Sequence, residues 1–291
     1  MRFQKTIKNN WQKKYNNKNK LEQLIIRSNL LGQDLKITNF GGGNTSSKII
    51  CKDPISKKNQ TVLYVKGSGG DLGSIKKEGF ASLYMEKLES LKSVYRGFNY
   101  EDEIVGYYPM CTFNNNPRAA SIDTPLHAYV PFPEVDHTHP DSIIALATMK
   151  NGKEIIKKVY NNKIGWLDWQ RPGFDLGLKM EKLIKKNKDI IGIVLGHHGL
   201  FTWGDTSEEC YKNSIDIIKK AQVYLNNSIK KYSFGKPIFK KKTYPEFEKK
   251  LISIIRGNLS FDNSKILHLD KSEICLEFVN SENLKKVASI G

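Results

Sequence analysis

Two histidines at alternate positions are the feature of this sequence that most directly indicates chemistry. His137 and His139 lie in the segment VDHTHP at residues 135–140. If that segment is a β-strand, alternate side chains share a face, so the two imidazoles can converge on one point. Neutral imidazoles are good zinc ligands, and catalytic zinc commonly has three protein ligands and one open position. The alternative is a pair of partly buried, hydrogen-bonded histidines that bind no metal.

A third metal ligand must come from another part of the chain, which has six histidines in all. His198 is the best candidate, because it follows the apolar run IIGIVLG at residues 190–196. The ends of buried strands are where sites in α/β proteins are built. We therefore expect His137, His139 and His198 to hold a divalent metal. If the strand geometry persists, His197 points the other way and has a supporting or structural role.

Asp123, in the segment SIDTPLH at residues 121–127, is a candidate acid or base. It lies shortly before the segment that carries His137 and His139, and a carboxylate beside a metal can shuttle protons. The alternative, which is the more frequent role of an isolated aspartate, is a helix cap or a surface charge.

Two glycine-rich loops are candidate phosphate sites. GGGNTSS at residues 41–47 and KGSGG at residues 66–70 combine accessible backbone N–H groups with hydroxyl side chains. Neither loop has the spacing GxGxxG or GxxxxGK[ST], so the sequence predicts neither a dinucleotide site nor a P-loop. Taken alone, each loop is explained as well by a tight turn.

Alternating helices and strands are expected to position these residues. Apolar residues at helical spacing predict a helix that ends near Gly32, and a long helix over residues 207–232. The segment 134–150 indicates a strand that gives way to a helix at Pro140. Further expectations are a strand, glycine turn and strand over residues 35–50, a strand leading into a glycine loop over 61–75, an amphipathic helix over 79–97 and a buried strand over 190–195.

Composition excludes several classes of protein. The 291 residues are 39% hydrophobic and 26% charged, which is too apolar for a disordered chain. No stretch approaches the about 20 apolar residues that span a bilayer, so we expect no membrane association. Four cysteines without a CxxC motif, and a basic N-terminus without a signal-peptide core, favour a reduced, cytoplasmic protein.

The net charge of +17 invites a nucleic-acid interpretation, because a basic face attracts phosphates. No nucleic-acid-binding motif accompanies the charge. We therefore interpret the excess as generic surface lysine and expect no nucleic-acid partner. Lys48 and Lys66, beside the two glycine loops, are candidates for attracting an anionic substrate.

Five motifs in order resemble the class II aldolase/adducin superfamily: GGGNTSSK, VKGSGGDL, SIDTPLH, DHTHPD and LGHHGLFTWG. They are most similar to the aldolase part of bifunctional rhamnulose-1-phosphate aldolase/dehydrogenase proteins. NNW, LLGQD, GFASL and WQRPGFDLGL are also similar to that group. The resemblance covers residues 11–230. It implies a catalytic domain over residues 1–230 and a small basic C-terminal extension over 231–291.

The resemblance implies an α/β fold, a three-layer α/β/α arrangement with a central, mainly antiparallel sheet. It also implies a divalent metal, usually zinc, no nucleotide cofactor and a symmetric homotetramer. The implied reaction is reversible cleavage of a ketose 1-phosphate, of the rhamnulose 1-phosphate type, to dihydroxyacetone phosphate and an aldehyde such as lactaldehyde. The implied pathway is rhamnose catabolism. The family's three ligands fall on His137, His139 and His198, and its catalytic carboxylate on Asp123. Its substrate-binding and phosphate-binding positions fall on Gly43, Asn44, Ser68, Gly69 and Ser121.

The chain departs from the family pattern at two positions and lacks a dehydrogenase fingerprint. Asp123 is one methylene shorter than the usual glutamate, and Ile122 stands where phosphate-handling aldolases often have a second serine. Without a Rossmann fingerprint, the chain is a stand-alone aldolase or part of a longer protein. The alternatives are a pentulose-phosphate 4-epimerase with the same metal site, and a non-catalytic adducin-like binding module.

Overall fold

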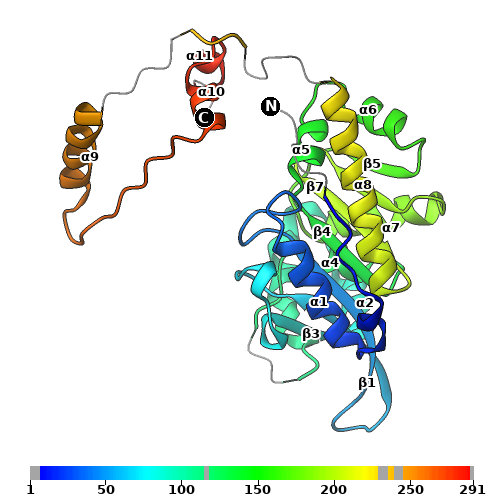
Figure 1. Cartoon of the computed structure of the whole chain (residues 1–291). Coiled ribbons are helices and arrows are strands. Elements are labelled where there is room, and N and C mark those ends of the chain that lie inside the picture. The colour runs from blue at the N-terminus through cyan, green and yellow to red at the C-terminus, as the bar shows by residue number, and fades with distance from the viewer. Residues whose placement is uncertain (1–6, 115–117, 229–234, 239–244, 289–291) are drawn as a thin grey trace. The chain divides into compact units, whose positions relative to one another are not determined.

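The computed structural model describes residues 7–114, 118–228, 235–238 and 245–288. The chain divides into two compact units, with the boundary between Leu225 and Asn226. The larger unit has a central sheet covered by helices on both faces (Figure 1). The three-layer α/β/α fold implied by the resemblance is therefore confirmed.

The sheet has seven strands in the order β3-β2-β1-β4-β7-β6-β5. All neighbouring strands are antiparallel except β5 and β6, which are parallel. The expected mainly antiparallel sheet is thus confirmed. The strands are β1 (Asn44–Lys52), β2 (Asn59–Lys66), β3 (Phe80–Tyr84), β4 (Glu134–Thr138), β5 (Ile164–Leu167), β6 (Gly192–Leu195) and β7 (Gly199–Gly204).

Helices form a layer on each face of the sheet. One layer contains α1 (Lys20–Gly32), α5 (Asp141–Ala147), α6 (Gly152–Val159) and α8 (Ser207–Ser228), and Figure 1 shows α1 and α8 side by side over this face. The other layer contains α2 (Met85–Val94), α3 (Glu101–Tyr107), α4 (Thr124–Ala128) and α7 (Phe174–Lys186). Short 3-10 helices at Lys13–Asn17, Leu72–Ser74, Lys77–Gly79, Phe98–Tyr100 and Tyr108–Cys111 lie in the connections.

The central strand β4 presents different chemistry on its two faces, because alternate residues point in opposite directions. Val135 packs with Phe201 of β7 and Met180 of α7 in an apolar cluster. His137 follows on the same face and stacks on Phe201, with ring centroids 4.2 Å apart. The opposite face carries Glu134 and Asp136, both fully buried.

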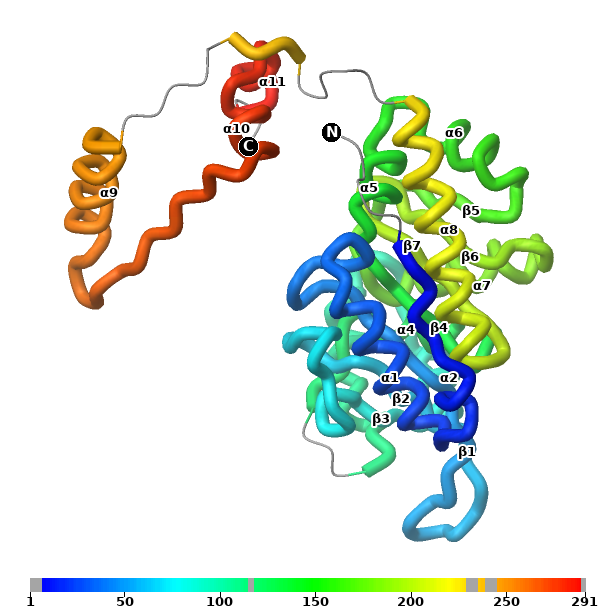
Figure 2. The backbone as a smooth tube through the Cα atoms, in the orientation of Figure 1, coloured from blue at the N-terminus to red at the C-terminus, as the bar shows by residue number. Residues whose placement is uncertain are grey.

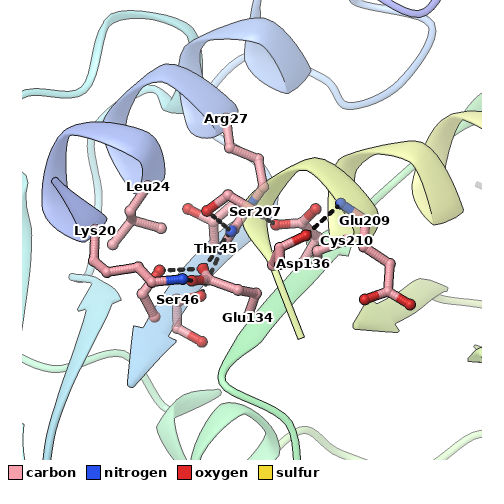
Figure 3. A network of polar contacts seen from close by, with 12 residues as sticks. Lys20, Leu24, Arg27, Thr45, Ser46, Glu134, Asp136, Ser207, Glu209 and Cys210 are labelled. Atoms are coloured by element: carbon pink, nitrogen blue, oxygen red, sulfur yellow. Dashed lines mark hydrogen bonds and ion pairs between the residues drawn. The ribbon is translucent and has the colours of Figure 1, made fainter. Parts of the chain in front are cut away.

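A buried arginine in α1 joins β1, β4 and α8 on that opposite face (Figure 3). Arg27 donates from Nε to Asp136 at 2.8 Å, and from Nη2 to the Ser46 carbonyl at 2.6 Å. Its Nη1 donates to Glu134 and, at 2.7 Å, to the Ser207 hydroxyl. Burial opposes the charge of Arg27, but the two carboxylates raise its pKa above the ordinary value. One side chain thus anchors three elements of the fold.

The N-terminal segment runs along α8, as the dark blue tube in Figure 2 shows. The Ile7 amide donates to Gln222 at 3.3 Å, and Asn16 donates to Glu208 at 2.6 Å. Between these contacts, Trp11 packs on Tyr211 with ring centroids 5.9 Å apart. The segment therefore covers α8 in the opposite direction to the helix.

Two elements differ from the sequence expectations. The prediction of a helix over residues 79–97 is wrong for its first part. Phe80–Tyr84 forms strand β3, and only Met85–Val94 is helical. Pairing with β2 gives the backbone of this apolar stretch its hydrogen bonds. The strand expected before the first glycine loop is a turn, in which Asp34 accepts from the Ile37 amide at 2.8 Å and from Lys36 at 3.0 Å.

The smaller unit contains helices α9 (Pro245–Leu259), α10 (Glu273–Val279) and α11 (Leu284–Ala288). The division into a catalytic region over residues 1–230 and an extension over 231–291 remains a prediction about function. Among the residues described, no helix is long and apolar enough to cross a bilayer.

Candidate metal centre

The structure brings together the three histidines that the sequence singled out. His137 lies in β4, His139 follows the end of that strand, and His198 lies in the turn between β6 and β7. One ring nitrogen from each residue lies within 4.8 Å of the others. The Nε2 atoms of His137 and His139 are 3.0 Å apart. Pairing of β4 with β7 produces this convergence, because it joins two distant segments at one end of the sheet.

Hydrogen bonds at the far side of two imidazoles set their tautomers. The Nδ1 atom of His137 is 3.2 Å from the Leu200 carbonyl, and that of His139 is 3.3 Å from the side-chain oxygen of Asn39. Both partners accept, so both Nδ1 atoms carry the proton and both Nε2 lone pairs face each other. The two Nε2 lone pairs repel each other unless a cation lies between the two nitrogens.

The spacing of these nitrogens agrees with a metal ion. Zinc–nitrogen bonds of about 2.1 Å in a tetrahedral site place two ligand nitrogens about 3.4 Å apart, near the 3.0 Å between His137 and His139. Outer hydrogen bonds from Nδ1 to oxygen are the usual support for ligating histidines. The donor set therefore fits a divalent cation such as zinc.

The protonation state of the three imidazoles also suits metal binding. Burial, followed by the neighbouring His139 and His198, holds the pKa of His137 well below its ordinary value. Burial lowers the pKa of His139 to about 4, and burial also lowers that of His198. All three rings are neutral near pH 7, which is the form that binds metals.

Two glycines leave room for the imidazoles. A Cβ on Gly42 would lie 3.1 Å from Nδ1 of His139, and one on Gly199 would lie 2.9 Å from Cδ2 of the same ring. The turn before Gly199 is tight, and His197 within it has a φ of 57°. His197 is exposed and outside the cluster. Its expected supporting role remains a prediction.

Asp123 lies immediately before α4 with its two oxygens in different environments. Oδ2 accepts a hydrogen bond from Nδ2 of Asn44 at 2.9 Å. Oδ1 is buried and has no hydrogen-bond partner among the described residues. Burial raises the pKa of Asp123, against the opposing influence of Asn44, His198 and Lys66. One oxygen is thus held in place while the other is available to a bound molecule.

Asn44 is oriented by a buried chain of polar groups that sequence reasoning missed. Nε2 of His127 lies 3.0 Å from Oδ1 of Asn44, and Nδ1 of His127 lies 2.8 Å from the Ser46 hydroxyl. Burial lowers the pKa of His127 to about 3, so the ring is neutral. It can therefore donate to Asn44 and accept from Ser46. The signal in the sequence is the four-residue separation of Asp123 and His127 in a helical segment.

The glycine loops lie beside these groups. Gly43 has a φ of 68°, and a Cβ there would lie 2.8 Å from the carbonyl of His137. Gly69 also has a φ of 68°. The Ser68 amide donates to the Ala119 carbonyl at 3.0 Å, which brings the second loop to the segment that carries Ser121. The Ser121 hydroxyl accepts from the Asp123 amide at 3.2 Å.

The two lysines named from the sequence have different positions. Nζ of Lys48 donates to the carbonyls of Val130 and Phe132, the latter at 2.9 Å, so the amine is used within the fold. Burial lowers the pKa of Lys48 to about 7. Lys66, in contrast, acts electrostatically on Asp123 and His139. Attraction of an anionic substrate by Lys66 or Lys48 remains a prediction.

Comparison with known proteins identifies the class. Residues 23–225 match the class II aldolase and adducin N-terminal domain, and the chain belongs to that family. The resemblance drawn from the five sequence motifs is therefore confirmed at the level of the family. The rhamnulose-phosphate subtype remains a prediction.

Individual relatives extend this result. The chain is 37% identical over 279 residues to the uncharacterized oxidoreductase YuxG of Bacillus subtilis, across 93% of this chain and 40% of that protein. It thus spans about 40% of the length of this curated relative. The N-terminal class II aldolase domain of a conserved protein from Thermoplasma acidophilum is 30% identical, with a TM-score of 0.68 over 76% of this chain and 100% of that one. A sugar-phosphate aldolase from Thermotoga maritima is 15% identical over 71% of this chain and 94% of that one, and its TM-score of 0.50 indicates a shared fold.

Proposed function

We propose that the chain is a metal-dependent aldolase with His137, His139 and His198 as ligands of zinc or another divalent ion. Its reaction would be the reversible cleavage of a ketose 1-phosphate, of the rhamnulose 1-phosphate type, to dihydroxyacetone phosphate and an aldehyde such as lactaldehyde. The observation that carries the proposal is the pair of facing Nε2 atoms 3.0 Å apart. Membership of the class II aldolase and adducin family supports it.

The proposed mechanism divides the work between the cation and Asp123. A divalent cation, when bound, stabilises the negative charge that develops on the ketose oxygens as the C3–C4 bond breaks. Asp123 is held at Oδ2 by Asn44, so its unpartnered Oδ1 can carry a proton. The raised pKa of Asp123 favours the protonated acid. In the cleavage direction the C4 hydroxyl loses its proton as the C3–C4 bond breaks; the Asp123 carboxylate would take up this proton and deliver it to C3, and synthesis would reverse both transfers.

The substrate phosphate would be held by the two glycine loops and their neighbours. The proposed contacts are those implied by the family: Gly43, Asn44, Ser68, Gly69 and Ser121. The proximity of the second loop to residues 119–121 supports a shared pocket. Because fixing the phosphate end positions the reacting carbons, these contacts would contribute to rate as well as affinity. The cytoplasmic homotetramer and the role in rhamnose catabolism implied by the resemblance belong to this proposal.

Metal analysis and a product assay test the proposal. Protein purified without chelator should hold about one divalent ion per chain, and His139→Ala should lose both the ion and activity. His197→Asn is the matched control, because His197 is an exposed neighbour in the left-handed region that asparagine tolerates. Activity is measured as dihydroxyacetone phosphate released from a panel of ketose 1-phosphates, with and without chelator.

Other outcomes would change the assignment. Conversion of ribulose 5-phosphate without cleavage products would show a pentulose-phosphate 4-epimerase. Metal binding without turnover of any sugar phosphate would favour the adducin-like binding module. Absence of metal after chelator-free purification would refute the metal-dependent mechanism.

A further inference from the structure

His127 in α4 is a fully buried imidazole with a partner at each ring nitrogen. Its Nδ1 lies 2.8 Å from the Ser46 hydroxyl, and its Nε2 lies 3.0 Å from Oδ1 of Asn44. Asn44 in turn donates from Nδ2 to Oδ2 of Asp123 at 2.9 Å. Four side chains, from Ser46 to Asp123, thus form one continuous series of hydrogen bonds.

The surroundings of the His127 ring keep it neutral. Burial, followed by the positive charges of Lys48 in β1 and Arg27 in α1, lowers the pKa of His127 to about 3. The ring of Phe201 in β7 packs edge-on against the imidazole, with centroids 5.5 Å apart. A neutral imidazole has one N–H group and one lone pair. What can vary at His127 is therefore which nitrogen carries the proton.

The groups at the two ends of the series select this tautomer. An ionised Asp123 can only accept, so Asn44 turns its NH2 group towards Asp123 and its Oδ1 atom towards His127. Nε2 of His127 must then carry the proton that Asn44 accepts. Nδ1 is left with a lone pair, and the Ser46 hydroxyl can donate to it. The opposite tautomer would set the lone pair of Nε2 against Oδ1 of Asn44.

The direction of these hydrogen bonds decides which oxygen of Asp123 can hold a proton. A proton on Oδ2 would face the NH2 group of Asn44, which cannot accept it. Oδ1 is buried and has no hydrogen-bond partner among the described residues. His198, Lys66 and Tyr108 also interact electrostatically with this carboxyl group. A proton taken up by Asp123 is therefore confined to Oδ1.

We propose that His127 is a positioning residue that, through Asn44, keeps the transferable proton of Asp123 on Oδ1. This inference rests on the proposed function. In the cleavage direction Oδ1 takes the proton from the C4 hydroxyl, and the electron pair of the broken C3–C4 bond stays with C3. The same proton then forms the new bond to C3, which regenerates the carboxylate. Without the N–H group of His127, the amide of Asn44 can turn over, and a proton on Oδ2 bonded to Asn44 becomes a competing state.

The tautomer of His127 can be measured without any substrate. The full chain is labelled with histidine that carries ¹⁵N at Nδ1 only, and the signal of His127 is identified by its loss in His127→Gln. The ¹⁵N chemical shift distinguishes a protonated from an unprotonated ring nitrogen. We expect an unprotonated Nδ1 at His127 at about pH 7. A protonated Nδ1 would overturn the proposal.

Hydrogen exchange at C3 of dihydroxyacetone phosphate in heavy water tests the positioning role, because it isolates the transfer by Asp123 from cleavage of the carbon bond. His127→Leu can neither donate nor accept, so the maximal exchange rate should fall at least about tenfold while KM is unchanged. His127→Gln can donate to Asn44 and accept from Ser46, so it should stay within about threefold of the wild type. Both variants should retain about one divalent ion per chain.

Two serine variants complete the test. Ser46→Ala removes the donor to Nδ1 and should lower the exchange rate at least about threefold. Ser82→Ala is the matched control, because it removes a buried hydroxyl from β3 that bonds to Asn114, and it should exchange within about twofold of the wild type.

The proposal is overturned if His127→Leu exchanges like the wild type, if His127→Gln is as slow as His127→Leu, or if the slow variants have also lost the metal. If His127→Leu does not fold, Ser46→Ala and the wild-type tautomer decide the result. Absence of exchange in the wild type, together with an unprotonated Nδ1, would refute the aldolase assignment while supporting the inferred orientation of Asp123.

Discussion

Replacing Gly199 by alanine should weaken metal binding while leaving the fold in place. The added Cβ would lie 2.9 Å from Cδ2 of His139 and 3.2 Å from Cε1 of His137, whereas ordinary contacts begin at 3.4 Å. The His139 ring must therefore move by about 0.5 Å, and a metal site tolerates only about 0.2 Å in its ligand distances. The same Cβ would lie 2.6 Å from the Thr138 carbonyl, so the strand end must also shift.

The expected loss of metal affinity is at least tenfold to a hundredfold, the range seen when the support of a ligand is removed. Affinity is measured by competition with a chromogenic chelator, and folding by circular dichroism and urea unfolding. Overpacking at this position should cost about 1–3 kcal/mol of stability, which the domain can withstand. Gly106→Ala is the control, because a Cβ in that part of α3 meets nothing within 4 Å. A folded Gly199→Ala protein with wild-type metal affinity would refute the reasoning about the site.

Three further changes test other parts of the structure. Asn39→Ala should weaken metal binding about tenfold, because it removes the acceptor that orients His139, and chelator competition should show it. Arg27→Met should lower the free energy of unfolding by about 3–5 kcal/mol, because two buried carboxylates lose their partner; a cost below about 1 kcal/mol in urea titration would contradict this. The pKa of Lys48 is about 7 in the folded chain, so between about pH 7 and about pH 10 the unfolded chain binds more protons, and stability should rise with pH. Lys48→Met should flatten this rise in urea titrations at several pH values.

The three histidines that the structure brings together could be named from the sequence because their signals are local. The alternation of His137 and His139 and the apolar run before His198 both indicate the end of a strand. Their convergence depends on the antiparallel pairing of β4 with β7, which no local pattern specifies. The ordered motifs supplied that information through the resemblance to a known family.

Other parts of the site could not be predicted, because they depend on contacts between distant segments. Arg118 lies against the glycine loop at Gly69, although the two residues are far apart in the sequence. The hydrogen-bonded groups Ser46, His127 and Asn44 likewise join strand β1 to helix α4, which are far apart in the sequence. The sequence predicts helix where strand β3 forms, because a short apolar stretch suits either structure until its partner strand is known.

The two faces of β4 have a consequence for the evolution of this fold. On the face that carries Glu134 and Asp136, Arg27 joins α1 to β1, β4 and α8. His137, a proposed metal ligand, projects from the other face and makes no bond to Arg27. A duplicated copy of the gene could therefore exchange His137 for another side chain and still fold. Single substitutions at this position could therefore convert the fold into a binding protein that catalyses no reaction, or into an enzyme with a different reaction.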